Sequence, residues 1–327
     1  MPNSPERSQI HIDVALTDIS IAYQQDASNF ICERIFPSIP VSKQSNKYYV
    51  YDKGDALRVH TQIRGAGAES AGAGYDITKD NYYCDPFALH TEVNDQDRAN
   101  TDDPLSLDTD GTEFVTNNIL MKKELDFFTK FFTTGVWEKD YTGVASGPTG
   151  DQVLRWDLAG SSPVADVTRI ASYIVSQTGV RKKEMTLTCE PGVWDVLKNH
   201  EEILDRIKYT EKGIVTEDLV AQVFGIKEVI EATAVYNAAV KGQVDDIKHM
   251  APAGTALLSY APSRPGLKKP SAGYTFNWTG YNKGSATAVY KWYIQERRAD
   301  RIEAETAYDQ KIVATDCAAF LTSLVTP

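Results

Sequence analysis

Residues 65–74, GAGAESAGAG, contain four glycines and four alanines between two segments that predict β-strands. Residues 57–63 alternate less polar with strongly polar side chains, and residues 87–93 show the same period of two, which is typical of strands. The two segments can pair antiparallel, with the glycine- and alanine-rich stretch near their turn. We therefore predict a long β-hairpin with a flexible tip.

A long hairpin limits what the rest of the chain can be. An isolated pair of strands is only marginally stable in water and exposes unpaired edges, so it needs another surface to pack against. A second copy of the chain is one surface that meets this need.

The same stretch does not fit the pattern of a phosphate-binding loop. A Walker loop needs a lysine and a hydroxyl residue directly after its last glycine, and neither follows Gly72 or Gly74. A dinucleotide-binding loop must open a helix, whereas Tyr75 opens a predicted strand. The stretch is therefore interpreted as a mobile tip.

The composition is that of a folded, soluble protein. Of 327 residues, 42% are hydrophobic, 10% aromatic and 24% charged. The longest apolar run, residues 317–321, is far shorter than the roughly 20 residues that span a bilayer. The N-terminus lacks a secretory signal, which predicts synthesis in a cytosol. This length predicts one elaborate domain or two simple ones.

The net charge of −11 and the pI near 5.0 argue against a protein that grips duplex DNA. Such binding depends on Lys and Arg side chains that neutralise phosphates. A protein that encloses nucleic acid remains compatible with this charge. The four cysteines lie far apart without a C-x-x-C pair and are predicted to be reduced packing residues: Cys32, Cys84, Cys189 and Cys317.

No catalytic or metal-binding motif is present in the sequence. There is no H-E-x-x-H pattern and no nucleophile elbow, and His90, Glu92 and Cys84 are better interpreted as part of a polar strand than as a metal corner. Asp108 and Asp110 fit part of a calcium loop that lacks its closing glutamate. We predict no enzyme activity, no cofactor and no metal site, and leave weak cation binding open.

A long helix is predicted after an acidic segment. Residues 92–113 hold eight acidic residues and one arginine, which is typical of a solvated linker. Thr112 can cap a helix that Gly135 stops, with a length of about 34 Å at roughly 1.5 Å per residue. The predicted apolar face consists of Phe114, Met121, Leu125, Phe128 and Phe132.

The remaining segments complete the predicted order. Residues 1–42 contain too little apolar mass to fold alone and predict an extended arm. Residues 161 to about 260 alternate helical and strand patterns and predict an α/β unit. Strand patterns return from residue 290, and residues 315–324 predict a short terminal helix.

This order resembles the major capsid protein of tailed bacteriophages, which has the Hong Kong 97-like fold. The resemblance covers nearly the whole chain, and its most telling stretches are residues 82–104, 155–167, 189–237 and 291–324. It implies an α+β fold with an N-terminal arm at 1–42, an extended β-hairpin loop at 43–93, a peripheral domain at 94–160 and 284–327 with a spine helix at 112–134, and an axial α/β domain at 161–283.

The resemblance also implies a function. The chain would self-assemble as hexamers and pentamers into the icosahedral shell of a virion, after synthesis in the host bacterial cytoplasm. The shell would enclose double-stranded DNA without sequence-specific binding and without a membrane, alongside possible separate scaffolding, portal and decoration proteins. The candidate assembly contacts are Arg58, His60, Arg64, Gly65, Gly74, Tyr75, Arg297 and Arg298.

Two departures from some relatives are expected. Some cross-link their subunits through a lysine and an asparagine, but no asparagine follows Asn282 here, so we expect a non-covalent lattice. Some begin with a long scaffolding segment, for which this chain has no room, so we expect any scaffold to be a separate protein.

Two other functions remain open at this point. An encapsulin-type compartment shares the fold but encloses an enzyme, so the cargo of purified particles separates it from a virion. A soluble α/β hydrolase would stay monomeric and turn over a substrate.

We expect that deleting Gly65–Gly74 leaves the subunit folded but weakens particles, because the tip contacts a neighbour rather than its own core. Particle yield and heat resistance, measured beside those of the unaltered chain, test this. Unchanged values for both would contradict the predicted role of the tip.

Overall fold

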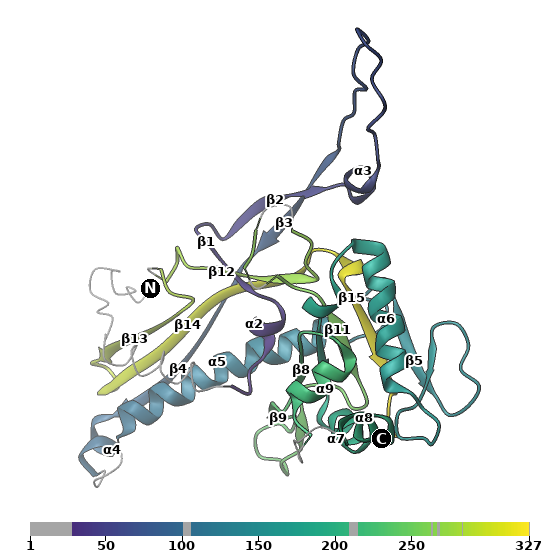
Figure 1. Ribbon diagram of the computed structural model, residues 1–327. Helices are drawn as coiled ribbons and strands as arrows, with labels where there is room; N and C mark the ends of the chain where they lie inside the picture. The colour runs from purple at the N-terminus through teal and green to yellow at the C-terminus, as the bar shows by residue number, and fades with distance from the viewer. Residues whose placement is uncertain are drawn as a thin grey trace.

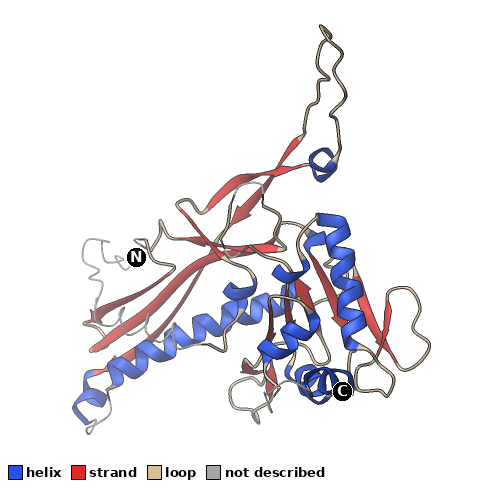
Figure 2. Cartoon of the chain, viewed as in Figure 1, coloured by secondary structure: helices blue, strands red, loops and turns tan. Residues whose placement is uncertain are grey.

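The computed structural model describes residues 28–100, 106–208, 215–262, 264–266, 269–282 and 284–326, so most of the predicted arm lies outside the described residues. The described chain has a sheet covered by one long helix, a second sheet with shorter helices, and a loop that rises away from both (Figure 1). Figure 2 shows that helices and strands are mixed along the chain, as the predicted α+β class requires.

The first sheet has five strands and is centred on its longest, β14. β1 pairs parallel with β12, and the other pairings are antiparallel. β13 and β12 pair with successive parts of one edge of β14, and β4 pairs along its other edge. The strands are β1 (Ser38–Val41), β4 (Asp85–Asn94), β12 (Gly273–Trp278), β13 (Thr287–Ile294) and β14 (Ala299–Ile312).

The long helix α5 (Leu107–Phe131) lies along this sheet (Figure 1). It begins five residues before the predicted Thr112, whose hydroxyl donates a hydrogen bond of 2.9 Å to the Asp108 carbonyl inside the helix. Phe114 was predicted on the buried face but is 57% exposed. The apolar spacing was misleading because the buried face includes polar side chains: Thr112, Thr116, Lys123 and Glu124.

The second sheet has six strands in the order β6–β5–β15–β11–β7–β8. β11 is antiparallel to both of its neighbours, and the remaining pairs are parallel. The strands are β5 (Asp140–Val144), β6 (Gln152–Leu154), β7 (Thr186–Cys189), β8 (Glu228–Glu231), β11 (Ala256–Ser259) and β15 (Ala318–Thr322).

Helices surround the second sheet within the segment that predicts an α/β unit, and one of them, at Glu201–Ile207, was not predicted. Two of them end at glycines with a left-handed backbone, Gly179 at φ 72° and Gly225 at φ 68°. The helices are α6 (Pro163–Thr178), α7 (Pro191–Asn199), α8 (Glu201–Ile207) and α9 (Glu217–Phe224). The shorter elements are α2 (Cys32–Ile35), η2 (Lys182–Glu184), β9 (Val235–Asn237), β10 (Ile247–His249) and η3 (Thr315–Cys317).

The second sheet is covered on both faces, which explains why every residue of β7 and β11 is buried. Leu258 and Leu321 belong to the core that includes α6, α7, α8 and α9. Leu257 and Phe320 belong to a second core, with the aromatic C-terminal end of α5. Because side chains alternate across a strand, β11 and β15 each contribute to both cores.

The predicted hairpin exists, but its strands are different. β2 (Ser45–Tyr51) pairs antiparallel with β3 (Ile77–Tyr83), and α3 (Lys53–Leu57) follows β2. Residues 58–76 form no regular strand, so the predicted pairing of 57–63 with 87–93 is wrong. β4 pairs with β14 over ten residues instead, which buries Val93 beside α5 residues.

Other predicted segment boundaries also differ from the sheets of the structure. β12 was predicted in the axial segment but lies in the first sheet, whereas β5, β6 and β15 were predicted in the peripheral segment and lie in the second. The predicted terminal helix is wrong, because residues 318–322 insert between two strands of that sheet as β15. The predicted acidic linker includes the end of β4, α4 (Asp95–Asn100) and the first turns of α5, while residues 101–105 lie outside the described chain.

Phe128 and Phe114 provide a matched test of the helix packing. Phe128→Asp places an unpaired carboxylate in the aromatic core, where the native side chain is 1% exposed, and should lower the free energy of unfolding by about 4 kcal/mol or more. Phe114→Asp, at an exposed position, should change it by less than about 1 kcal/mol. Chemical denaturation measures both, and equal effects would contradict the observed helix face.

Candidate assembly interface

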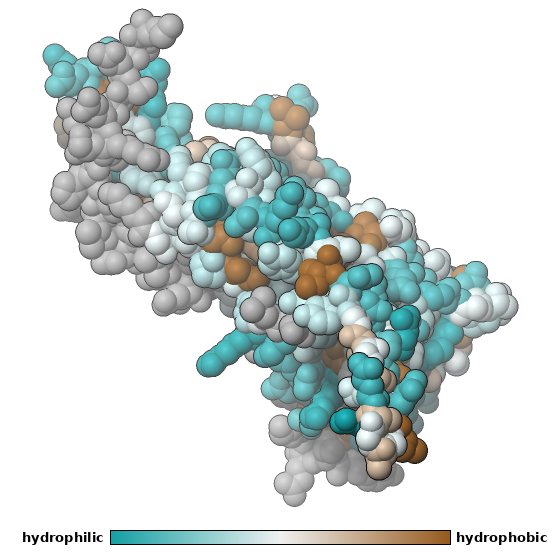
Figure 3. All heavy atoms as spheres, turned by 90° about the horizontal axis from the view of Figure 1, so that it is seen from above, coloured by the Kyte–Doolittle hydropathy of each residue, from teal (hydrophilic) through white to brown (hydrophobic). Residues whose placement is uncertain are grey.

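The projecting loop, residues 45–83, exposes an unusual set of apolar side chains. Val59 and Ile63 are almost completely exposed, and neither lies near the two cores. Seven large apolar residues of the loop are exposed: Tyr49, Leu57, Val59, Ile63, Tyr75, Ile77 and Tyr83. Seen from above, the face from which the loop rises carries hydrophobic residues among hydrophilic ones (Figure 3). Large apolar side chains that share one exposed loop indicate an interaction surface.

The base of the loop is firmly attached to the first sheet. The ring of Tyr82 stacks on Phe276 at 4.7 Å, and Tyr48 stacks on the same ring at 5.6 Å. Tyr48 donates a hydrogen bond of 2.6 Å to Asp80, which also forms a 2.9 Å ion pair with Lys311. Burial, together with Asp80, raises the pKa of Tyr48. The strands β2 and β3 therefore leave the body in one defined direction.

Lys53 at the start of α3 forms a 2.5 Å ion pair with Asp316, and beyond it the outer part of the loop has only local contacts among the described residues. Asp52 caps α3 by accepting a 2.9 Å hydrogen bond from the Asp55 backbone, and Arg64 donates a 2.6 Å bond to the Ala68 carbonyl. Gly67 has φ 80°, which only glycine adopts without strain. These bonds shape the tip without attaching it to either sheet.

The eight predicted contact residues fall into two separate places. Six lie on the outer loop: Arg58, His60, Arg64, Gly65, Gly74 and Tyr75. Arg58 pairs locally with Asp55 at 3.3 Å, and Tyr75 is largely exposed.

The other two, Arg297 and Arg298, lie at the turn between β13 and β14, away from the loop (Figure 1). Arg297 donates two hydrogen bonds to Glu92, at 2.8 and 2.9 Å, and Arg298 has φ 47°. Hydrogen bonds from Arg301 and Arg297 lower the pKa of Glu92. Both arginines therefore lie at the turn that joins two strands of the first sheet. Their contact with a neighbouring subunit stays a prediction.

The described end of the predicted arm is held by a buried carboxylate, and its residues Cys32–Ile35 form helix α2 instead of extended chain. The backbone N–H groups of Ile31 and Cys32 donate hydrogen bonds of 3.0 and 2.9 Å to the two carboxylate oxygens of Glu124. Next to it, Lys123 forms a 2.5 Å ion pair with Glu33. The start of α2 is thus bound to the middle of α5.

The pKa values of Glu124 and Glu33 shift in opposite directions. Burial raises the pKa of Glu124, although the two N–H groups act against this rise. Partial desolvation acts to raise the pKa of Glu33, whose side chain is about half exposed, but Lys123 lowers it below its ordinary value. The sequence contained one signal for this anchor, a glutamate within the aromatic segment of the predicted helix, but its partners are about 90 residues away.

His90, Glu92 and Cys84, which were weighed as metal ligands, do not come together in one site. Glu92 contacts arginines, and the thiol of Cys84 points to the Phe276 carbonyl at 3.5 Å. His90 lies 3.9 Å from Glu303. The described ranges contain no group of three or more potential metal ligands.

All four cysteines are free and buried, as predicted. No described helix has the length and apolar character needed to cross a membrane.

Glu124→Gln tests the anchor. An amide offers only one acceptor oxygen, so one buried N–H of α2 loses its partner, which should lower the free energy of unfolding by about 1–3 kcal/mol. Glu113→Gln, at an exposed position on the same helix, is the matched control. Denaturant melts of both variants measure this, and equal stabilities would show that the anchor contributes nothing.

Known proteins resemble this chain in sequence. No family model matches it. The major capsid protein of Burkholderia phage BcepMu is 23% identical over 284 residues, which cover 82% of this chain and 84% of that protein. The major capsid protein of Pseudomonas phage JBD67 is 23% identical over 237 residues, which cover 72% of this chain and 70% of that protein.

Solved structures share the fold. A phage-related protein from Bordetella bronchiseptica RB50 has a TM-score of 0.72, with 18% identity and coverage of 97% and 99% of the two chains. The capsid of cyanophage P-SCSP1u has a TM-score of 0.59, with 10% identity and coverage of 88% and 86%. A virus-like particle from Pyrococcus furiosus has a TM-score of 0.52, with 7% identity and coverage of 94% and 97%. The predicted resemblance is therefore confirmed: the chain has the Hong Kong 97-like capsid fold and is similar to the major capsid proteins of tailed phages.

Proposed function

We propose that this chain is the structural major capsid protein of a tailed phage and that its copies assemble into an icosahedral shell around double-stranded DNA. One observation carries the proposal. The loop of residues 45–83 is attached rigidly at its base, yet it presents Val59 and Ile63 to solvent beyond any surface of its own subunit. A neighbouring copy supplies the missing surface.

The loop also explains how the subunits can assemble into closed rings. A projection on one part of the subunit and a receiving surface on another form a head-to-tail contact, and such contacts generate rings when the rotation closes. Rings of six and five subunits are the proposed units of the shell. Each subunit then contributes and receives a loop, so moderate contacts add up across the lattice.

The electrostatics suit a container. A net charge of −11 disfavours tight contact between the wall and packaged DNA, so the DNA is enclosed without sequence-specific binding. We propose a role without catalysis, a lattice without covalent cross-links, and a location in the virion. Separate scaffolding, portal and decoration proteins remain proposed partners.

Particle formation tests this function. The chain expressed in bacteria should form closed shells in negative-stain micrographs, and particles purified from a productive infection should contain nuclease-protected DNA. A chain that stays monomeric by light scattering would overturn the proposal and favour a soluble α/β enzyme. Shells that co-purify with an enzyme and lack DNA would instead favour an encapsulin-type compartment, which the fold permits.

A further inference from the structure

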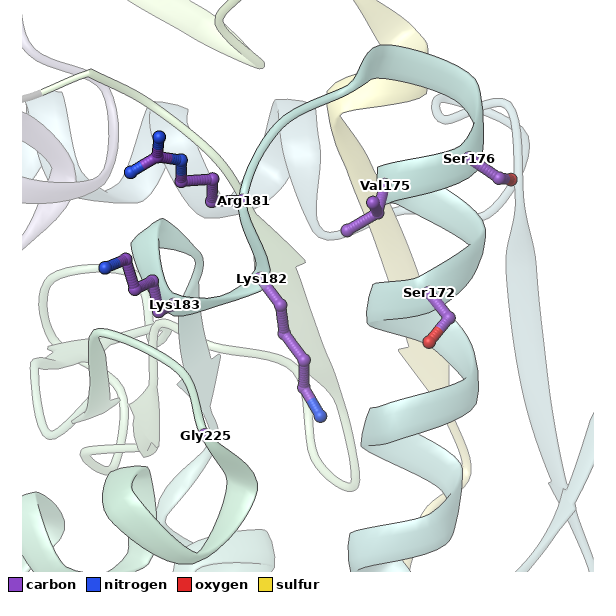
Figure 4. Close-up of a pocket in the computed structure, with 7 residues that line it drawn as sticks. All are labelled: Ser172, Val175, Ser176, Arg181, Lys182, Lys183 and Gly225. Atoms are coloured by element: carbon purple, nitrogen blue, oxygen red, sulfur yellow. The ribbon is translucent and has the colours of Figure 1, made fainter.

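A basic hollow lies at one end of the second sheet. Its volume is about 620 Å³, and it lies between the C-terminal half of α6, the short helix η2 and the turn at Gly225. Figure 4 shows Lys182 extending into the gap between η2 and α6, whereas Arg181 and Lys183 extend away from that helix. The lining residues are Ser172, Val175, Ser176, Arg181, Lys182, Lys183 and Gly225.

The three cations at this hollow, Arg181, Lys182 and Lys183, are named here the basic end. No carboxylate within the described part of the chain forms an ion pair with any of them. Lys182 donates a 2.9 Å hydrogen bond to the Thr168 hydroxyl, and burial lowers its pKa. Glu184 is the one acidic neighbour in η2, so the segment keeps a positive charge in a chain whose net charge is −11.

The opposite end of the same strands is acidic. β7 and β8 run parallel, and their N-terminal ends follow η2 and the Gly225 turn. At their C-terminal ends Glu231 is surrounded by carboxylates, so that burial and then Glu217 and Asp195 raise its pKa. Lys198 and His249 offset only part of this charge. We name four residues the acidic end: Asp195, Glu217, Asp218 and Glu231.

The two ends are separated by the length of the strands. Four residues at about 3.3 Å each place them at least about 10 Å apart on opposite sides of one compact unit. At the acidic end Asp195 forms an ion pair with Lys198, whereas Glu217, Asp218 and Glu231 form none among the described residues. Opposite charges placed in this way favour a directed contact between identical copies.

We propose that the basic end of one subunit docks on the acidic end of the next, so that charge complementarity sets the head-to-tail direction of the ring. This inference rests on the proposed shell function and adds the contact that orients neighbouring copies. It accounts for both ends at once, because every copy in a closed ring has each end covered by a neighbour. Salt should weaken this contact more than it weakens contacts of the apolar loop.

Charge reversal provides the test. Arg181→Glu with Lys183→Glu makes both ends acidic. Asp218→Lys with Glu231→Lys balances the two carboxylates that remain at the acidic end, so that Lys198 beside them leaves both ends basic. Each double variant should lower particle yield at least tenfold. The chain that carries all four substitutions has complementary ends again, and it should recover most of the yield of the unaltered chain.

An equal mixture of the two double variants gives a sharper result. The two kinds of subunit can only alternate around a ring, so rings with an even number of subunits should form and five-membered rings should not. Native mass spectrometry and micrographs of the products distinguish these cases. Five-membered rings in the mixture would overturn the proposed contact.

Two controls keep the result interpretable. Lys208→Glu with Lys241→Glu changes the net charge equally at exposed positions outside both ends and should leave the yield unchanged. Circular dichroism shows whether each variant folds, and Arg181→Gln with Lys183→Gln, which introduces no repulsion, should still lower the yield and its salt dependence.

The outcomes separate this inference from the function on which it rests. If the unaltered chain forms no particles, the shell function fails. If it forms particles but the fourfold variant gives no recovery, only the contact fails. If the basic-end variants assemble normally and lose only bound nucleic acid or inorganic phosphate, the hollow is a phosphate site and the contact is wrong.

Discussion

The packing around Phe36 joins parts of the molecule that are far apart in the sequence. Its ring centroid lies 5.0 Å from that of Phe127 and 4.8 Å from that of Phe131, both on α5, and 6.3 Å from that of Trp137. A side chain at Gly273 in β12 would meet the same ring at 2.2 Å, so the sheet backbone also lies against it. The described end of the arm, the long helix and the first sheet therefore form one rigid body.

This rigid support keeps the projecting loop directed away from its own subunit. A loop on a soft support would fold back and bury its apolar side chains, whereas stacking of Tyr48 and Tyr82 on Phe276 directs it outward. The cost of exposing Val59 and Ile63 is then recovered only when another surface covers them. In the proposed shell, another copy of the chain covers the apolar side chains of the loop. Other copies also pair with the two charged ends of the second sheet.

Electrostatic features serve two different tasks in this structure. Glu124 is buried and bound to the two N–H groups at the start of α2, where a loss of partners would be costly, so it acts within the subunit. The cations around Lys182 have no carboxylate partner among the described residues, so their charge is available for contacts between subunits. Burial and pairing, rather than residue type, separate these two tasks.

The sequence by itself determined the local elements and their order. The long helix with regular apolar spacing was predicted because a helix depends on contacts within one or two turns. The projecting tip at 65–74 followed from composition alone. The resemblance in the order of elements was enough to predict the capsid fold and the class of function.

Only the tertiary structure decided which strands pair and which side chains become an anchor. β4 pairs with β14 rather than with residues 57–63, and residues 318–322 become a strand because β11 and β5 enclose them. The buried position of Glu124 and the opposite charges at the two ends of β7 and β8 likewise arise from residues distant in the sequence. Strand pairing and burial depend on such non-local contacts, which no local pattern encodes.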